Sequence, residues 1–71
     1  MTIEKATFTS SNLNAMEYDT ITNTLQLRFN TGDVYLYFGV PQQTVNELKF
    51  AVSAGTYFHR FIRGKFEYKK K

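Results

Sequence analysis

The segment from Gly32 to Pro41 constrains the fold most, because its strand-like pattern carries no polar side chain from Val34 to Phe38. Successive side chains of a strand point to opposite faces, so a strand on a small domain should alternate apolar and polar residues. Here Tyr35 and Tyr37 share one face, and the other face is also apolar, formed by Val34, Leu36 and Phe38. A chain of 71 residues can cover one face of a small sheet with its own helices, but hardly both. The second face therefore predicts a partner: another subunit, a ligand or a nucleic acid.

Length and composition indicate one domain over residues 1–71, with a core from about residue 10 to residue 68. A chain of this size buries only about 60% of its unfolded surface. Cysteine is absent, so neither a disulfide nor a thiolate metal site can stabilise the domain. His59 is the single histidine and cannot anchor zinc without carboxylate ligands. We therefore expect no metal and no cofactor, and stability from aromatic packing and homo-oligomerisation.

The N-terminal segment does not have the pattern of a targeting signal. Glu4 and Lys5 lie within the first ten residues, and no apolar run follows them. No stretch approaches the ~20 apolar residues that a membrane span needs. We expect a soluble cytoplasmic protein that has no membrane partner.

The charge of the chain is unevenly distributed. Residues 1–48 contain two basic and five acidic residues, a net charge of −3, whereas residues 49–71 contain seven basic residues and one acidic, a net charge of +6. Aromatic residues are interleaved with these charges, among them Tyr57, Phe58, Phe61, Phe66 and Tyr68. Cations pair with phosphates and rings stack on bases, so this composition favours a nucleic-acid partner. The alternative is that the rings belong to the core and the cations are solvated.

The hydrophobic pattern predicts an α+β fold: a three-stranded antiparallel meander followed by two helices. The strands are expected at residues 13–18, 24–29 and 34–38, with a hairpin at Gly32 between the last two. Residues 1–12 show no sustained period and are expected to form an irregular lead-in. Pro41 suits the first turn of a helix over residues 41–52, whose buried face would include Val52. A short C-terminal strand at residues 66–68 would complete the domain.

A second helix is predicted over residues 54–63. Ser53 is a plausible N-cap for this helix, and Gly64 is a natural C-terminal stop. The free backbone N–H groups at Ser53, Gly55 and Thr56 form a candidate phosphate site. Arg60 and Arg63 follow on the same helix, with Lys65 just beyond it, and arginines pair with phosphate bidentately. Ordinary capping by Ser53, with solvated arginines, is the alternative interpretation.

Tyr35 and Tyr37 form the second candidate site. Two tyrosines two residues apart on a strand would present parallel rings that can stack two bases. Alternatively, both tyrosines belong to the core under the helices. In that case Val34, Leu36 and Phe38 form an apolar outer patch that would act as an interface.

The residues do not favour catalysis. Arg60 and Arg63 flank His59, so no carboxylate is positioned to orient it as a general base. Glu17, Asp19 and Asp33 are expected at strand ends and turns, where carboxylates are usually solvated. The four glycines are widely separated and form no phosphate-binding loop. We expect a binding protein and no enzymatic activity.

An ordered set of motifs runs along most of the chain. Its residues are Ser11-Asn12, Tyr18-Asp19, Thr24-Leu25, Phe29, Gly32, Tyr35, Tyr37, Gly39-Val40-Pro41, Ala51, Ser53, Gly55, Tyr57-Phe58 and Ile62-Arg63. Together they resemble the KTSC domain, a short module named after the C-terminus of some lysyl-tRNA synthetases that also occurs alone in bacteria and phages. The match runs from about residue 10 to residue 68, and His59 replaces an asparagine common in the family.

The resemblance implies a compact α+β module, with the Tyr35–Tyr37 strand central, and a role in RNA binding. It implies no catalytic residues. Two functions therefore remain open. One is a nucleic-acid-binding module, with RNA preferred. The other is a homo-oligomeric interaction protein, bacterial or phage-encoded, that captures a small anionic ligand such as a nucleotide signal, or a host protein.

Overall fold

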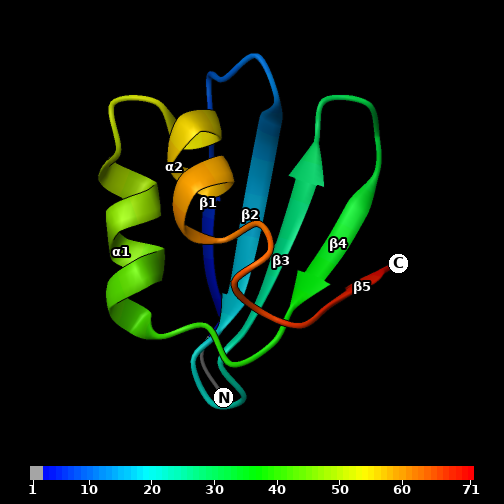
Figure 1. The fold of residues 1–71 in the computed structure, drawn as a ribbon, viewed down its shortest axis with the longest axis vertical. Helices are drawn as coiled ribbons and strands as arrows, with labels where there is room; N and C mark the ends of the chain where they lie inside the picture. Colours follow the sequence, from blue (N-terminus) through cyan, green and yellow to red (C-terminus); the bar gives the residue numbers. More distant parts are fainter. Residues whose placement is uncertain (1–2) are drawn as a thin grey trace.

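The computed structural model describes residues 3–71 and consists of one five-stranded antiparallel sheet with two helices on one of its faces (Figure 1). The strand order in space is β1-β2-β3-β4-β5, which is also the order along the chain. The first two residues of the predicted lead-in lie outside the described residues. The α+β class is confirmed, but the prediction of three strands was too low. The strands and helices are β1 (Ile3–Thr7), β2 (Leu13–Asp19), β3 (Thr24–Phe29), β4 (Val34–Tyr37), α1 (Gln42–Phe50), α2 (Ala54–Phe61) and β5 (Tyr68–Lys70).

The three predicted strands correspond to β2, β3 and β4. The boundaries of β3 agree with the prediction, because Leu25 and Leu27 are buried and alternate with polar residues. A β-bulge between Leu13 and Ala15 interrupts the pairing of β2 with β3. The bulge shifts the alternation by one residue, so that Leu13 and Met16 both face the core although they are three residues apart.

Strand β1 corrects the expectation of an irregular lead-in. It pairs with β2 along its whole length, from Ile3 opposite Asp19 to Thr7 opposite Ala15. Its sequence lacks a hydrophobic pattern because no side chain of β1 is fully buried. The strand is held by backbone pairing and by Glu4, whose carboxylate binds Lys49 of α1 at 3.1 Å. These are long-range contacts that local periodicity does not indicate.

Strand β5 lies two residues beyond the predicted position. Tyr68, Lys69 and Lys70 pair with Tyr37, Leu36 and Tyr35 respectively, although all three residues of β5 are exposed. Backbone hydrogen bonds flank this ladder at both ends, from Phe38 N to Glu67 O at 3.0 Å and from Lys71 N to Val34 O at 2.8 Å. The position of β5 is therefore determined by the unpaired edge of β4, because lysine itself has a low β-propensity.

The helix boundaries follow local capping signals. Pro41 is the N-cap residue of α1, so the helix begins at Gln42, one residue after the predicted start. The helix ends at Phe50 because Ala51 is extended, and Val52 is fully exposed instead of buried as predicted. Helix α2 begins at Ala54 as predicted and ends at Phe61, two residues early. Gly64 has a φ of +76°, which agrees with its predicted role as a stop after the helix.

The core lies between the helices and the face of the sheet that they cover. It contains Leu13, Met16, Tyr18, Leu25, Leu27, Tyr37, Val40, Val45, Leu48, Ala54, Phe58 and Ile62. Tyr18 is fully buried, and its hydroxyl donates to Val40 O at 2.6 Å while Asn23 Nδ2 donates to that hydroxyl at 2.7 Å. Its one polar atom is therefore satisfied, as burial requires.

The contacts of Glu4 make the stability of the domain depend on pH. Hydrogen bonds from Lys49 and Gln42 lower the pKa of Glu4 below its ordinary value of 4.5. Because the folded-state pKa is the lower one, the ionised carboxylate stabilises the fold above pH 4.5, and this contribution is lost as the pH falls through the folded-state pKa. We expect E4Q to be less stable than the wild type at neutral pH, with the difference shrinking at about pH 3.

Urea unfolding at the two pH values measures this effect. E67Q is the matched control, because it makes the same charge change at an exposed side chain that has no ion pair among residues 3–71. Equal losses for E4Q and E67Q at neutral pH would show that the contacts of Glu4 contribute nothing.

Candidate functional site

An aromatic cleft lies on the helix-covered side of the sheet, where α2 leaves part of β3, β4 and β5 open. Its volume is about 550 Å³. The segment after α2 crosses the sheet to reach β5 (Figure 1). Tyr68 of β5 lines the cleft on the side away from α2. The lining residues come from four parts of the chain: Ser11, Asn12, Phe29, Asn30, Thr31, Asp33, Tyr35, Tyr37, Phe58, His59, Arg63, Gly64 and Tyr68. We refer to this set of residues as the aromatic cleft.

Three tyrosines line the aromatic cleft. The ring centroid of Tyr68 is 5.9 Å from that of Tyr35 and 5.8 Å from that of Tyr37. Tyr37 is buried in the core at 5% exposure, Tyr35 is half-buried, and Tyr68 is 62% exposed. Tyr68 was named only among the aromatic residues of the basic C-terminal third and not as a candidate site residue, yet it presents the most accessible ring of the three. Its place directly before three lysines was the available signal.

The expectation that the rings of Tyr35 and Tyr37 are parallel is corrected by the geometry. Their planes are inclined by 47° at a centroid distance of 6.5 Å. Each ring packs edge-on against a different neighbour, Tyr35 against Phe29 and Tyr37 against Phe58. The core interpretation therefore holds for Tyr37, and Tyr35 lies at the border between core and cleft.

Burial also sets the chemistry of Tyr37. Desolvation raises the pKa of Tyr37 to about 12, with smaller raising effects from Tyr35 and Tyr68 and a lowering effect from Arg63. Tyr37 is consequently a neutral phenol at physiological pH. It can donate or accept a hydrogen bond in the cleft, but it is not poised to act as a base.

One wall of the aromatic cleft is cationic. Arg63 follows the end of α2, where its backbone N–H donates to Phe58 O at 2.9 Å. Its guanidinium Nη1 lies 3.3 Å from Nδ1 of His59, which also lines the cleft. Arg60 is exposed and does not line the cleft, so of the two arginines predicted to bind phosphate Arg63 borders the cleft and Arg60 does not. Lys65 is exposed beside a separate shallow groove that includes Tyr68.

The predicted phosphate site at the start of α2 has local structural partners. The Ser53 hydroxyl accepts from Thr56 N at 3.3 Å and donates to Thr56 Oγ1 at 3.0 Å. Gly55 is buried, and a Cβ added there would lie 3.2 Å from Ser10 Oγ and 3.3 Å from Asn12 Nδ2. Ser53 is thus an ordinary N-cap, and Gly55 permits α2 to approach the β1–β2 loop. Phosphate binding by these residues stays a prediction.

The C-terminal lysines divide between the two faces of the sheet. Lys70 is opposite Tyr35 and forms an ion pair with Asp33 at 3.6 Å, so it lies at the aromatic cleft side. Lys69 is opposite Leu36, and Lys71 Nζ donates to Gln26 Oε1 at 3.2 Å. These two lysines therefore belong to the outer face, which carries no helix.

The predicted interface residues Val34, Leu36 and Phe38 do not form a fully exposed apolar patch. Val34 and Leu36 are half-buried on the outer face, since β5 pairs with β4 and places Lys69 beside Leu36. Phe38, beyond the end of β4, is 40% exposed. The chain itself shields much of the second apolar face, which corrects the premise that a partner must cover it. Homo-oligomerisation stays a prediction.

Residues 3–71 bring no three histidine, cysteine, aspartate or glutamate side chains together in a group that could hold a metal ion. Within the same residues, neither helix is long and apolar enough to cross a membrane.

Comparisons with known proteins agree with this architecture. The KTSC domain model matches residues 9–66. Lysine–tRNA ligases of Trichormus variabilis and a Nostoc species are 49% identical over 53 residues and 45% identical over 58 residues. These matches cover 75% and 82% of this chain, but the chain spans only about a tenth of the length of each ligase, 9% and 10%.

Two other matches extend over most of both proteins. A protein of Tsukamurella paurometabola is 35% identical over 57 residues, which cover 80% of this chain and 85% of that protein. The crystal structure of a KTSC domain protein from Yersinia pestis superposes with a TM-score of 0.89 at 31% identity, over 99% of each chain. Because the family model matches most of its length and the fold agrees, this chain belongs to the KTSC domain family.

Proposed function

We propose that this protein is a non-enzymatic binding module for single-stranded nucleic acid, with RNA preferred, and that the aromatic cleft holds one unstacked base. The observation that carries the proposal is the ring of Tyr68, 62% exposed at a cleft that also contains Arg63. An aromatic ring of this kind stacks on any base and contributes about 1–3 kcal/mol per base. The nearby cations supply the complementary charge for phosphates.

The arrangement of charge suggests how the RNA strand would lie across the cleft. Arg63 is on the α2 side of the cleft and Lys70 is on β5, on the same face as Tyr35. A base between these elements would stack on Tyr68, while the flanking phosphates pair with the guanidinium and the ammonium groups. Arg63 would exchange its contact with His59 for a charge-assisted bond to phosphate, which is the stronger interaction.

The other end of the cleft provides polar groups that suit the edge of a base. Asn12 and Thr31 come from two loops there, and both are exposed. A base can reach such groups with its hydrogen-bonding edge only when it is unpaired and unstacked, as in single strands and RNA loops. The matched ligases act on a tRNA according to their name, which supports RNA as the polymer.

A binding titration with a matched pair of tyrosine variants tests the proposal. We expect Tyr68→Ala to weaken the binding of a labelled single-stranded RNA by about 5- to 150-fold in fluorescence anisotropy, the equivalent of one lost stacking contact. Tyr57→Ala is the control, because Tyr57 contacts Phe61 and Glu47 away from the aromatic cleft. Thermal unfolding of both variants verifies that they are folded.

The outcomes separate clearly. A loss for Tyr68→Ala with Tyr57→Ala unchanged supports stacking in the cleft. Equal losses for the two variants, or no RNA binding by the wild type at low salt, would rule the proposal out. In the second case a small anionic ligand becomes the better candidate, since the cleft is bounded by α2, β5 and two loops. Titration with mononucleotides then tests this alternative.

A further inference from the structure

The outer face of the sheet carries cations in regular register. Pairing places Arg28 of β3 opposite Val34 of β4, and Lys71 N donates to Val34 O on the other side of β4. Lys69 lies in the adjacent row, opposite Leu36. Neighbouring strands are about 4.8 Å apart, so Arg28 and Lys71 are separated by roughly 10 Å at their backbones. We call Arg28, Lys69 and Lys71 the outer basic set.

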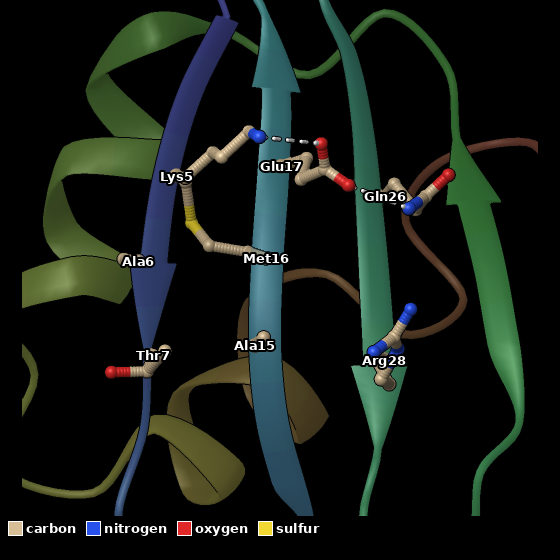
Figure 2. A pocket seen from close by; sticks show the side chains of 8 residues that line it. All are labelled: Lys5, Ala6, Thr7, Ala15, Met16, Glu17, Gln26 and Arg28. Carbon is tan, nitrogen blue, oxygen red and sulfur yellow. Dashed lines mark hydrogen bonds and ion pairs between the residues drawn. The ribbon is translucent and has the colours of Figure 1, made fainter.

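Glu17, which lies on the same face of the sheet, is already paired. Glu17 lies 3.9 Å from Lys5 Nζ through Oε1, and its Oε2 accepts from Gln26 Nε2 at 3.2 Å (Figure 2). Arg28 and Lys69 have no ion pair or side-chain hydrogen bond within residues 3–71. Lys71 contacts only the neutral amide of Gln26 with its side chain. None of the three cations of the outer basic set forms an ion pair within residues 3–71.

The shape of this face leaves room for a ligand beside Arg28. A shallow hollow of about 400 Å³ borders it, with Ala15 in the floor between Thr7 and Arg28. Figure 2 shows the side chain of Arg28 over β3, on the face of the sheet turned away from the helices, and β4 and β5 follow β3 in the strand order. No helix covers this face, so the guanidinium is accessible, and Arg28 is exposed.

From these observations we propose that the outer basic set is a second phosphate-contacting surface, which binds the continuation of an RNA strand that leaves the aromatic cleft. The proposal rests on the proposed function of the cleft. Strand β5 is the physical link, because its consecutive lysines alternate between faces: Lys70 on the cleft side, Lys69 and Lys71 outside. An RNA strand that passes around the β5 edge of the sheet would meet a cation on each face.

RNA length provides the test. The probes are labelled oligouridylates of about three nucleotides, which fill the cleft alone, and of about twelve nucleotides, within the about 4–16 that small single-strand-binding domains cover. The variant R28Q/K69Q/K71Q removes the outer charges, and R28K/K69R/K71R retains them as the control. Both are titrated at about 50 mM and about 200 mM salt.

For the long probe, each of the three phosphate contacts contributes about 0.7 to the slope of log affinity against log salt concentration. The slope of R28Q/K69Q/K71Q should therefore be smaller than that of the wild type by about two. Between the two salt concentrations, the affinity of this variant should fall about 20-fold less than the affinity of the wild type. The charge-retaining variant should behave as the wild type, and the short probe should bind all three proteins equally. Equal slopes for the long probe would overturn the outer surface and leave the cleft intact. Failure of both probes to bind the wild type would instead overturn the function proposed for the cleft.

Discussion

Replacing Phe58 by alanine is expected to destabilise the domain by about 3–5 kcal/mol, the usual cost of truncating a buried aromatic ring. Phe58 is 4% exposed and packs edge-on against Phe29 at 5.4 Å and against Tyr37 at 5.6 Å. A chain of 71 residues has a total stability of about 4–10 kcal/mol, so the variant would lie near its unfolding threshold. Urea unfolding followed by circular dichroism measures the loss.

Phe58→Leu separates the effect of volume from that of the ring. It retains much of the buried apolar volume, and such a volume-conserving exchange usually costs less than about 1.5 kcal/mol. Because Phe58 also lines the aromatic cleft, RNA affinity should fall in the leucine variant while the fold persists. A loss of stability below about 1 kcal/mol in Phe58→Ala would contradict the position of this ring in the core.

Replacing Gly55 by leucine is expected to cost about 1–3 kcal/mol, because the added side chain must displace the β1–β2 loop. A single Cβ at this position already approaches Ser10 Oγ to 3.2 Å and Asn12 Nδ2 to 3.3 Å. Ser10 Oγ in turn accepts from the backbone N–H groups of Asn12 and Leu13, so the loop cannot move without weakening these bonds. Unfolding midpoints in urea measure the cost.

Gly55→Ala is the informative comparison for this variant. Alanine gains about 1 kcal/mol in helix propensity over glycine, which offsets the slight crowding of its Cβ. We expect its stability to remain close to that of the wild type. If Gly55→Leu were equally well tolerated, the close approach of α2 to the loop would not be the reason for glycine at this position.

Local signals in the sequence were sufficient for much of the fold. Strand β3 followed from its strict alternation, and the β3–β4 hairpin followed from Gly32, whose φ is +95°. Ser53 and Gly64 marked the beginning and the end of the second helix. The ordered motifs were also sufficient to identify the KTSC family, which the family model and the solved structure confirm. Each of these features depends on residues that are close together in the chain.

The site depended on contacts between distant parts of the chain. Strands β1 and β5 form at sheet edges through backbone pairing, so their side chains carry little pattern, and both were missed or misplaced. The position of β5 then decides which lysines face the aromatic cleft, and it brings Tyr68 beside Tyr35 and Tyr37 from 31 to 33 residues away. Local periodicity indicates that side chains alternate, but the pairing partner and its register determine which of them meet. For that reason Arg63 and Tyr68 come to line one cleft, with Lys70 on the same face of the sheet, only when the sheet is assembled.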